Sequence, residues 1–160
     1  FHYSPCLKIY HLVYKLISKL WQHKMKKYKA MVLSCMDPRF QTKVSNYLKR
    51  RKLNNKYSAF TIAGAAVGVT ASKFKKWHTT FWENLNTSIK IHRIEKLIVI
   101  NHKDCGAAKI VNGRKEFTPQ NEMKIHEYSF EKIKLNLKKK HPRLKVELNL
   151  MSLNGRVDKF

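Results

Sequence analysis

The sequence has few cysteines and no long apolar run, and both absences restrict what the protein can be. No stretch approaches the roughly 18 consecutive apolar residues of a membrane-spanning helix, so we expect no membrane span. Three cysteines in 160 residues are a small and odd number. They argue against a disulfide framework and favour a reducing, cytoplasmic location with thiols free for metal binding or catalysis. No internal repeat or long linker divides the chain, so residues 29–160 are expected to form one domain.

Acidic residues are also scarce, because 10 Asp and Glu stand against 34 Lys and Arg, which gives a formal net charge of +24. Such a charge normally suggests nucleic acid or an anionic surface as a partner. The lysines are spread along the whole chain, however, and the composition is generally rich in Lys, Asn and Ile. We therefore expect a solvated basic surface and no specific nucleic-acid partner, and keep a basic nucleic-acid-binding module as a less favoured alternative.

Residues 1–28 precede the first predicted strand and form a separate segment. Its apolar side chains recur at helical spacing, with lysines on the other faces; they are Tyr10, Val13, Tyr14, Ile17, Leu20 and Trp21. Three interpretations stay open. The segment is an amphipathic arm that packs on this domain or on a partner subunit, a basic targeting segment, or a non-native leader that ends before Met25. Cys6 lies here without a companion, and we assign it no role.

From residue 29 onward, short apolar runs alternate with longer amphipathic stretches. The runs predict four strands, at 30–35, 58–66, 96–101 and 144–153. The amphipathic stretches between them predict helices at 40–53, 73–94 and 118–140. Strands separated by helices indicate an α/β fold with a central, mostly parallel sheet of about four strands flanked by helices. In such sheets, functional residues collect beyond the carboxyl ends of the strands.

Chemically active side chains follow two of these strands. "SCMDPRF" (34–40) places Cys35, Asp37 and Arg39 at alternate positions, and "NHKDCGAA" (101–108) supplies His102 and Cys105. Two thiolates and one imidazole are ligands that zinc takes in a tetrahedron, and a fourth position left open is typical of a catalytic site. A single strand-end cysteine is more often a small buried apolar residue. What favours a metal site is the joint placement at two strand ends that a parallel sheet brings together.

These motifs resemble those of the β-class carbonic anhydrases. That family carries Cys-x-Asp-x-Arg after its first strand and His-x-x-Cys-Gly after its third, and "TIAGAA" (61–66) resembles its Ala-Gly turn. The resemblance extends from about Met31 to Val157. It implies a β-carbonic-anhydrase-like zinc domain at 29–160, a homodimer or higher homo-oligomer, and reversible hydration of CO2 to bicarbonate by a zinc-bound hydroxide.

The resemblance also implies a role for each residue of the two motifs. Zn2+ would be bound by Cys35, His102 and Cys105. Asp37 would accept a hydrogen bond from the hydroxide, or bind zinc as a fourth ligand in a closed state, and Arg39 would hold Asp37 away from the metal. Gly64 and Gly106 would lie at the substrate, where Gly106 lets backbone approach the anion.

The sequence departs from the family pattern at Thr61 and Ile62, where many members carry Arg-Asn. Two further alternatives therefore stay open: a non-catalytic relative whose zinc site Asp37 closes, and a hydrolase of COS or CS2. Aromatic residues on the second helix are expected to pack in the core or at a dimer interface; they are Trp77, Phe81 and Trp82. Four histidines are candidate proton carriers, with the surface as their default place: His78, His92, His126 and His141.

Overall fold

The structure is a computed structural model that describes residues 13–15, 27–113 and 116–160. Most of the proposed N-terminal arm lies outside these residues, as does Cys6, so the hypotheses about that segment stay predictions. Within the described part of the chain, no helix is long and apolar enough to cross a membrane.

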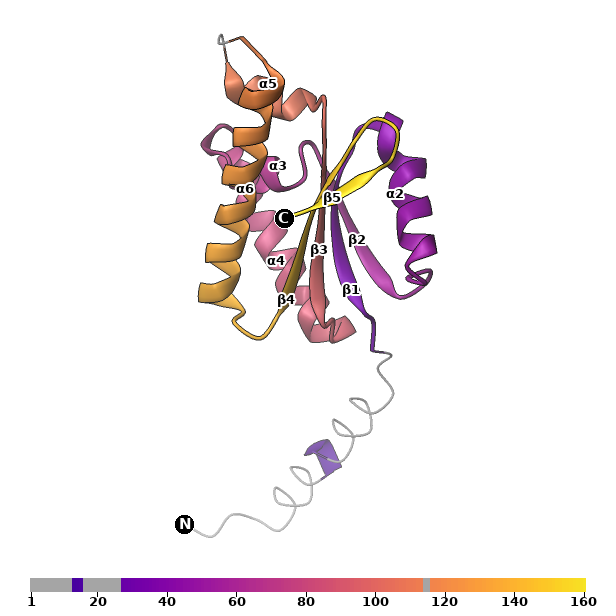
Figure 1. The fold of residues 1–160 in the computed structure, drawn as a ribbon. Helices are drawn as coiled ribbons and strands as arrows, with labels where there is room; N and C mark the ends of the chain where they lie inside the picture. The colour runs from indigo at the N-terminus through magenta and orange to yellow at the C-terminus, as the bar shows by residue number, and fades with distance from the viewer. Residues whose placement is uncertain (1–12, 16–26, 114–115) are drawn as a thin grey trace.

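One five-stranded sheet organises the domain, in the order β2-β1-β3-β4-β5 (Figure 1). The strands are β1 (Ala30–Cys35), β2 (Tyr57–Ile62), β3 (Lys96–His102), β4 (Lys145–Met151) and β5 (Val157–Lys159). The first four are parallel, and β5 runs antiparallel to β4. The mostly parallel α/β fold is thus confirmed, with one more strand than expected. At three residues, β5 is too short to give a periodic signal in the sequence.

Helices cover both faces of the sheet. The helical elements are α2 (Pro38–Arg50), α3 (Ala66–Thr70), η1 (Ser72–Phe74), α4 (Lys75–His92), α5 (Gly106–Asn112) and α6 (Pro119–Lys140). Figure 1 shows α2 on one face and α3, α4 and α6 on the other. The short helices α3 and α5 were not predicted. The strand predicted at 58–66 ends at Ile62, because the chain turns there and continues into α3.

Alternation of side chains along the strands divides the core between the two faces. Leu33 of β1 belongs to the larger apolar cluster under α4 and α6, and its neighbour Val32 belongs to the smaller cluster under α2. Phe81 of α4 is fully buried in the larger cluster, and Trp82 packs against it. Packing in the core therefore explains both aromatic side chains.

Two helix starts follow from local sequence. At α2 the Asp37 carboxylate accepts a hydrogen bond from the backbone N–H of Arg39, and Pro38 occupies the first turn. At α6 the Thr118 hydroxyl caps the backbone N–H of Asn121 in the same way. Side-chain caps and an early proline are both favourable at a helix N-terminus. The cap at α2 also fixes Asp37 directly beyond the end of β1.

Candidate metal centre

The parallel register brings the ends of β1 and β3 together, and with them three potential metal ligands. Cys35 is the last residue of β1 and His102 the last of β3, while Cys105 lies at the N-terminus of α5. Their ligand atoms all lie within 4.8 Å of one another, and all three residues are buried. The structure thus places side by side the three residues that the sequence predicts as zinc ligands.

The His102 ring is oriented with one nitrogen toward this cluster. Its Nδ1 lies 2.9 Å from the carbonyl oxygen of Lys103. A carbonyl only accepts, so Nδ1 carries a proton, and in the neutral ring Nε2 keeps a lone pair. Nε2 is buried and has no hydrogen-bond partner among the described residues. A backbone carbonyl that fixes the tautomer and leaves the other nitrogen free is the usual arrangement of a metal-binding histidine.

The two thiols are electrostatically coupled. The contact with Cys105, helped by His102 and by backbone N–H groups, holds the pKa of Cys35 well below its usual range although burial opposes it. The backbone N–H of Gly64 donates to Cys35 Sγ over 3.2 Å. The Cys35 thiolate in turn raises the pKa of Cys105, and burial adds to this effect. Without a cation, one thiol of the pair therefore keeps its proton, and a divalent metal that binds here displaces it.

Asp37 and Arg39 form a multidentate ion pair at the solvent side of the cluster. Arg39 Nη2 lies 2.7 Å from Asp37 Oδ2, and Arg39 Nε lies 3.1 Å from Oδ1. The hydrogen bonds from Arg39 lower the pKa of Asp37 to about 2. Asp37 Oδ2 also lies 3.9 Å from His102 Nε2, so an ionised carboxylate stands beside the three potential ligands.

Arg39 also reaches the loop between His102 and Cys105. Its Nη1 donates to the Asp104 carboxylate over 2.6 Å, and its Nη2 donates to the Asp104 carbonyl oxygen over 2.9 Å. Asp104 has a φ of 58°, in the left-handed region that is unusual for a residue with a side chain. The sequence interpretation overlooked Asp104, although it lies inside the His-x-x-Cys motif.

The two predicted substrate-site glycines differ in their surroundings. Gly64 has a φ of +76°, and a Cβ added there would lie 2.7 Å from Cβ of Ala107. Glycine is therefore required at this turn, which supplies the N–H that contacts Cys35. Gly106 begins α5, and a Cβ there would meet no atom within 4 Å. A close approach of backbone to a ligand at Gly106 stays a prediction.

A buried set of polar side chains lies behind the cluster, on the side away from Arg39. Asn101, Glu122 and His126 are all at most 8% exposed. Glu122 and His126 are four residues apart on the inward stripe of α6, where the other members are mostly apolar. Their place at inward positions of a helix, where apolar residues are expected, is the sequence feature that could have indicated Glu122 and His126. His126 is fully buried, which makes it unsuited to the surface role considered from the sequence.

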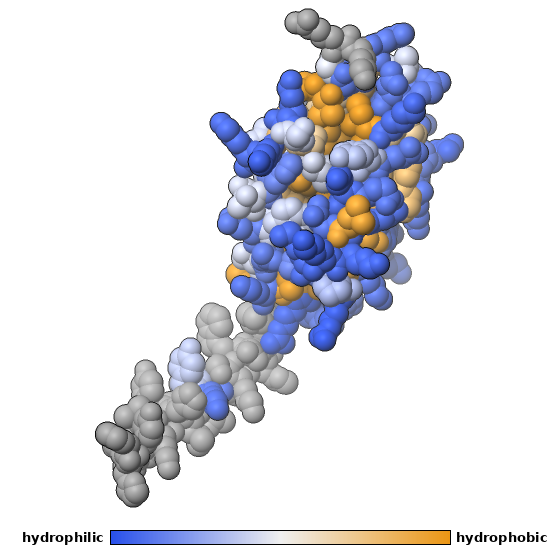
Figure 2. All heavy atoms as spheres, turned by 90° about the vertical axis from the view of Figure 1, so that its left-hand side faces the viewer, coloured by the Kyte–Doolittle hydropathy of each residue, from blue (hydrophilic) through white to orange (hydrophobic). Residues whose placement is uncertain are grey.

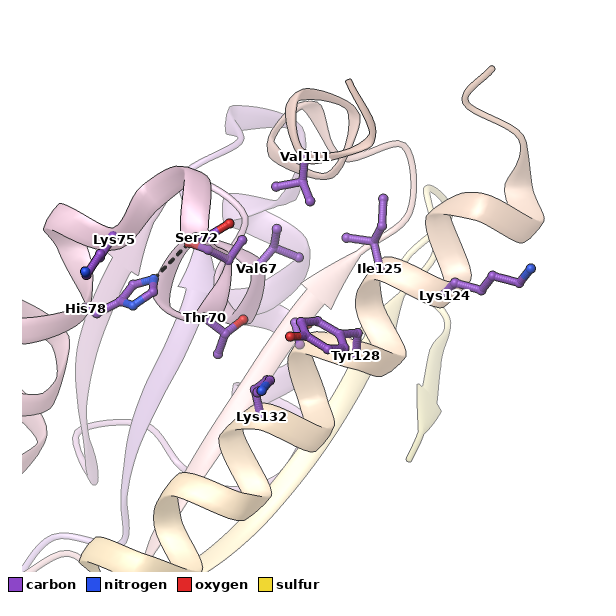
Figure 3. Close-up of a pocket in the computed structure, with 12 residues that line it drawn as sticks. Val67, Thr70, Ser72, Lys75, His78, Val111, Lys124, Ile125, Tyr128 and Lys132 are labelled. Atoms are coloured by element: carbon purple, nitrogen blue, oxygen red, sulfur yellow. Dashed lines mark hydrogen bonds between the residues drawn. The ribbon is translucent and has the colours of Figure 1, made fainter. Parts of the chain in front are cut away.

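A cleft of about 600 Å³ opens on the α6 face, separate from the ligand cluster (Figure 3). Val67, Val111 and Ile125 converge in it, and Tyr128 points toward it from α6. Lys124 extends away from the cleft. Figure 2 shows this face, mostly hydrophilic with hydrophobic side chains gathered near the top. Its lining contains none of the three potential metal ligands.

Comparison with known proteins supplies the family. A family described as "Putative carbonic anhydrase" matches residues 25–139. The chain belongs to this carbonic anhydrase family. An uncharacterized protein of Rickettsia conorii is 27% identical to it over 131 residues, which cover 81% of this chain and 70% of that one. An uncharacterized protein of Rickettsia bellii is 25% identical over 131 residues, or 81% of this chain and 80% of that one.

Solved structures of β-carbonic anhydrases share the fold of this family member. One of two tetrameric enzymes from Sordaria macrospora matches with a TM-score of 0.59 at 9% identity, over 96% of this chain and 97% of that one. The enzyme CafA of Aspergillus fumigatus matches with a TM-score of 0.57 at 10% identity, over 97% and 88% of the two chains. The chain is thus a divergent carbonic anhydrase relative with the β-class fold.

Proposed function

We propose that the protein is a zinc-dependent carbonic anhydrase that catalyses the reversible hydration of CO2 to bicarbonate. The observation that carries the proposal is the buried Nε2 of His102, which has no hydrogen-bond partner among the described residues. It lies within 4.8 Å of the sulfur atoms of Cys35 and Cys105. A buried nitrogen with no hydrogen-bond partner is costly unless a ligand satisfies it. Sulfur and imidazole donors are those that zinc prefers, so the residues fit this metal.

Three protein ligands distinguish the proposed site from a closed structural one. Cys35, His102 and Cys105 would hold the ion and leave a fourth position open. When bound in this way, zinc makes hydroxide available near neutral pH by lowering the pKa of water, to about 7 in carbonic anhydrase itself. The two thiolates cancel the charge of the ion, so we expect activity to rise toward alkaline pH.

Asp37 would act as the hydrogen-bond acceptor beside this fourth position. It is ionised at any pH well above 2. The pairing with Arg39 involves both carboxylate oxygens, and this supports a state in which Arg39 keeps Asp37 off the metal. A planar guanidinium suits this task because it binds both oxygens of a carboxylate in a fixed orientation. Arg39 would thus be a positioning residue for Asp37.

We also propose where the substrate binds, how the protein assembles and which residues form its zinc domain. CO2 would approach between the Gly64 turn and the start of α5 at Gly106. We also propose a homo-oligomer, which the tetrameric Sordaria macrospora enzymes support by similarity of fold. The zinc domain would comprise residues 29–160.

Stopped-flow CO2 hydration by zinc-loaded protein, near neutral and at alkaline pH, tests the proposal. Asp37→Ala should lower the rate by about 100-fold or more, the range in which proton-transfer and acceptor groups contribute, while zinc content stays the same. Asp37→Asn is the matched variant, because asparagine also caps a helix. Asp158→Ala, on β5, is the control and should keep full activity.

Two results would contradict the proposal. One is wild-type protein that is fully loaded with zinc and inactive at both pH values, which would favour a non-catalytic site. The other is undiminished hydration in both Asp37 variants with zinc retained, which would remove Asp37 from the mechanism.

A further inference from the structure

Glu122 lies buried at the back of the loop that joins His102 to Cys105. Its Oε1 accepts a hydrogen bond from the backbone N–H of Cys105 over 2.8 Å. Burial alone would raise the pKa of Glu122, but His126 and the backbone N–H groups of Cys105 and Asp104 hold it below its usual range. The carboxylate is therefore hydrogen-bonded to the ligand loop at Cys105, and Arg39 contacts the same loop at Asp104.

The orientation of the neighbouring side chains can be derived from a single backbone donor. The N–H of Ala66 donates to Asn101 Oδ1 over 3.0 Å. The other end of the Asn101 amide is then its NH2 group, which donates to His126 Nδ1 over 2.9 Å. Since Nδ1 accepts, the proton of the neutral ring is on Nε2. Nε2 lies 3.6 Å from Glu122 Oε1, which is beyond hydrogen-bond distance, and it has no hydrogen-bond partner among the described residues, so its contact with the carboxylate is electrostatic.

Hydrogen bonds run from Ala66 through Asn101 to His126, His126 lies next to Glu122, and Glu122 accepts from the Cys105 N–H of the loop. Such a set costs free energy when a member is left unpaired in the interior, and it keeps its members rigid when all are paired. It ends on the segment that contains Asp104 in its left-handed conformation, which is unfavourable for most residues with a side chain. The loop that supplies two of the three potential ligands is thus held at a strained residue.

We propose that Glu122 is a positioning residue for the metal site, which holds the backbone of Asp104 and Cys105 in the geometry that directs the Cys105 sulfur toward His102 and Cys35. His126 and Asn101 orient Glu122 in turn. This inference rests on the proposed zinc site but not on CO2 hydration, because it concerns the shape of the ligand loop. Partners of this kind around a metal site typically change metal affinity by about 10- to 100-fold when they are removed.

Zinc affinity, measured by competition with a chromophoric chelator, tests the proposal in Glu122→Gln. A glutamine replaces one carboxylate oxygen with an NH2 group and removes the negative charge, which weakens the bond from the Cys105 N–H. We expect zinc to bind about 10- to 100-fold more weakly than in the wild type. Glu127→Gln changes the same side chain on the exposed face of α6, and should leave the affinity unchanged.

A second variant separates positioning from general destabilisation. Glycine adopts a positive φ without strain, so Asp104→Gly lowers the need for a group that holds this residue. Glu122→Gln should therefore weaken zinc binding less in a chain that also carries Asp104→Gly than in the wild type. Because Asp104→Gly also removes the carboxylate that Arg39 contacts, Asp104→Gly alone is the reference for the double variant. If Glu122→Gln weakens zinc binding as much in the Asp104→Gly background as in the wild type, or if Glu122→Gln binds zinc within about twofold of the wild type, the proposal is overturned.

The metal-free wild-type protein gives a measurement that depends on no variant. The Cys105 amide proton should be strongly protected from hydrogen exchange, and two-bond ¹⁵N–¹H spectra should place the His126 proton on Nε2. Rapid exchange at Cys105 or a proton on Nδ1 would refute the arrangement. A wild-type protein that shows both features and binds zinc but hydrates no CO2 would contradict the proposed function alone.

Discussion

The two sides of the Cys35–His102–Cys105 cluster are built differently. On the solvent side, Arg39 joins Asp37 and Asp104 through charged hydrogen bonds, and the Arg39 and Asp104 side chains are 47% and 61% exposed. On the interior side, the buried Glu122 carboxylate lies next to His126, which accepts a hydrogen bond from Asn101. Both sides contact the same loop, Arg39 at the carbonyl of Asp104 and Glu122 at the N–H of Cys105.

Because the two sides differ in exposure, we expect the Arg39 side and the Glu122 side to have different roles. Exposed ion pairs are screened by water and salt and contribute little to stability. The exposed pair instead orients a side chain, because Arg39 fixes the direction in which the ionised Asp37 carboxylate points. Buried hydrogen bonds are not screened, so they set the shape of the loop. We therefore expect changes on the interior side to affect folding and metal binding, and changes on the solvent side to affect the protonation of Asp37.

Removing a ligand should have the largest effect and sets the scale for both sides. In Cys105→Ser, two of the three proposed ligands remain, so zinc affinity should fall by more than the roughly 100-fold expected from a supporting residue. Zinc content after dialysis against a chelator checks this. Cys6→Ser, which changes the cysteine outside both motifs, is the control and should keep its zinc. Full retention of metal in Cys105→Ser would remove Cys105 from the ligand set.

The buried Gly64 turn can be changed by a substitution that alters no charged group. In Gly64→Ala the added Cβ would lie 2.7 Å from Cβ of Ala107, at a φ of +76°. The strained backbone and the overpacking together should lower the free energy of unfolding by about 2 to 4 kcal/mol. Urea denaturation measures the loss.

Gly113→Ala is the matched control for this change, because Gly113 also has a positive φ, of +72°, but no atom would lie within 4 Å of the new Cβ. It should cost only the backbone strain, about 1 to 3 kcal/mol. Equal losses in the two variants would show that packing against Ala107 does not matter.

The smallest effect on folding is expected on the solvent side. In Arg39→Gln the hydrogen bonds that lower the pKa of Asp37 are lost, so this pKa should rise from about 2 toward the ordinary value near 3.9. Carbon-13 NMR of the carboxyl group measures it. Arg156→Gln breaks a comparable Arg–Asp pair with Asp158 and should leave the pKa of Asp37 unchanged.

The sign of the pH dependence follows from this shift. Because the pKa of Asp37 is lower in the folded protein than in the unfolded chain, its contribution to stability is present above pH 4 and is lost as the pH falls through about 2. The stability difference between wild type and Arg39→Gln should therefore shrink on acidification across this range. A difference that is constant between pH 5 and pH 2 would contradict the assignment.

Much of the fold could be predicted from local pattern. The apolar run of β3 marked a strand covered on both faces, and six of its seven residues are buried. The two motifs placed Cys35 and His102 at strand ends, and the parallel register brings such ends together by geometry. The inward stripe of α6 was apparent from its spacing as well. The spacing of residues in α6 could not reveal why Glu122 and His126 interrupt its apolar stripe.

The sequence by itself therefore determined the α/β order of elements and the three residues that the cluster contains, because periodicity and motif spacing act over a few residues. Only the tertiary structure decided what surrounds them. Arg39 contacts Asp104 across 65 positions of the chain, and Asn101 contacts His126 across 25. Contacts of this kind depend on how helices dock on the sheet. The motif singled out Arg39 but not its contact with Asp104, and the inward position of His126 did not reveal its contact with Asn101, because packing selects these companions.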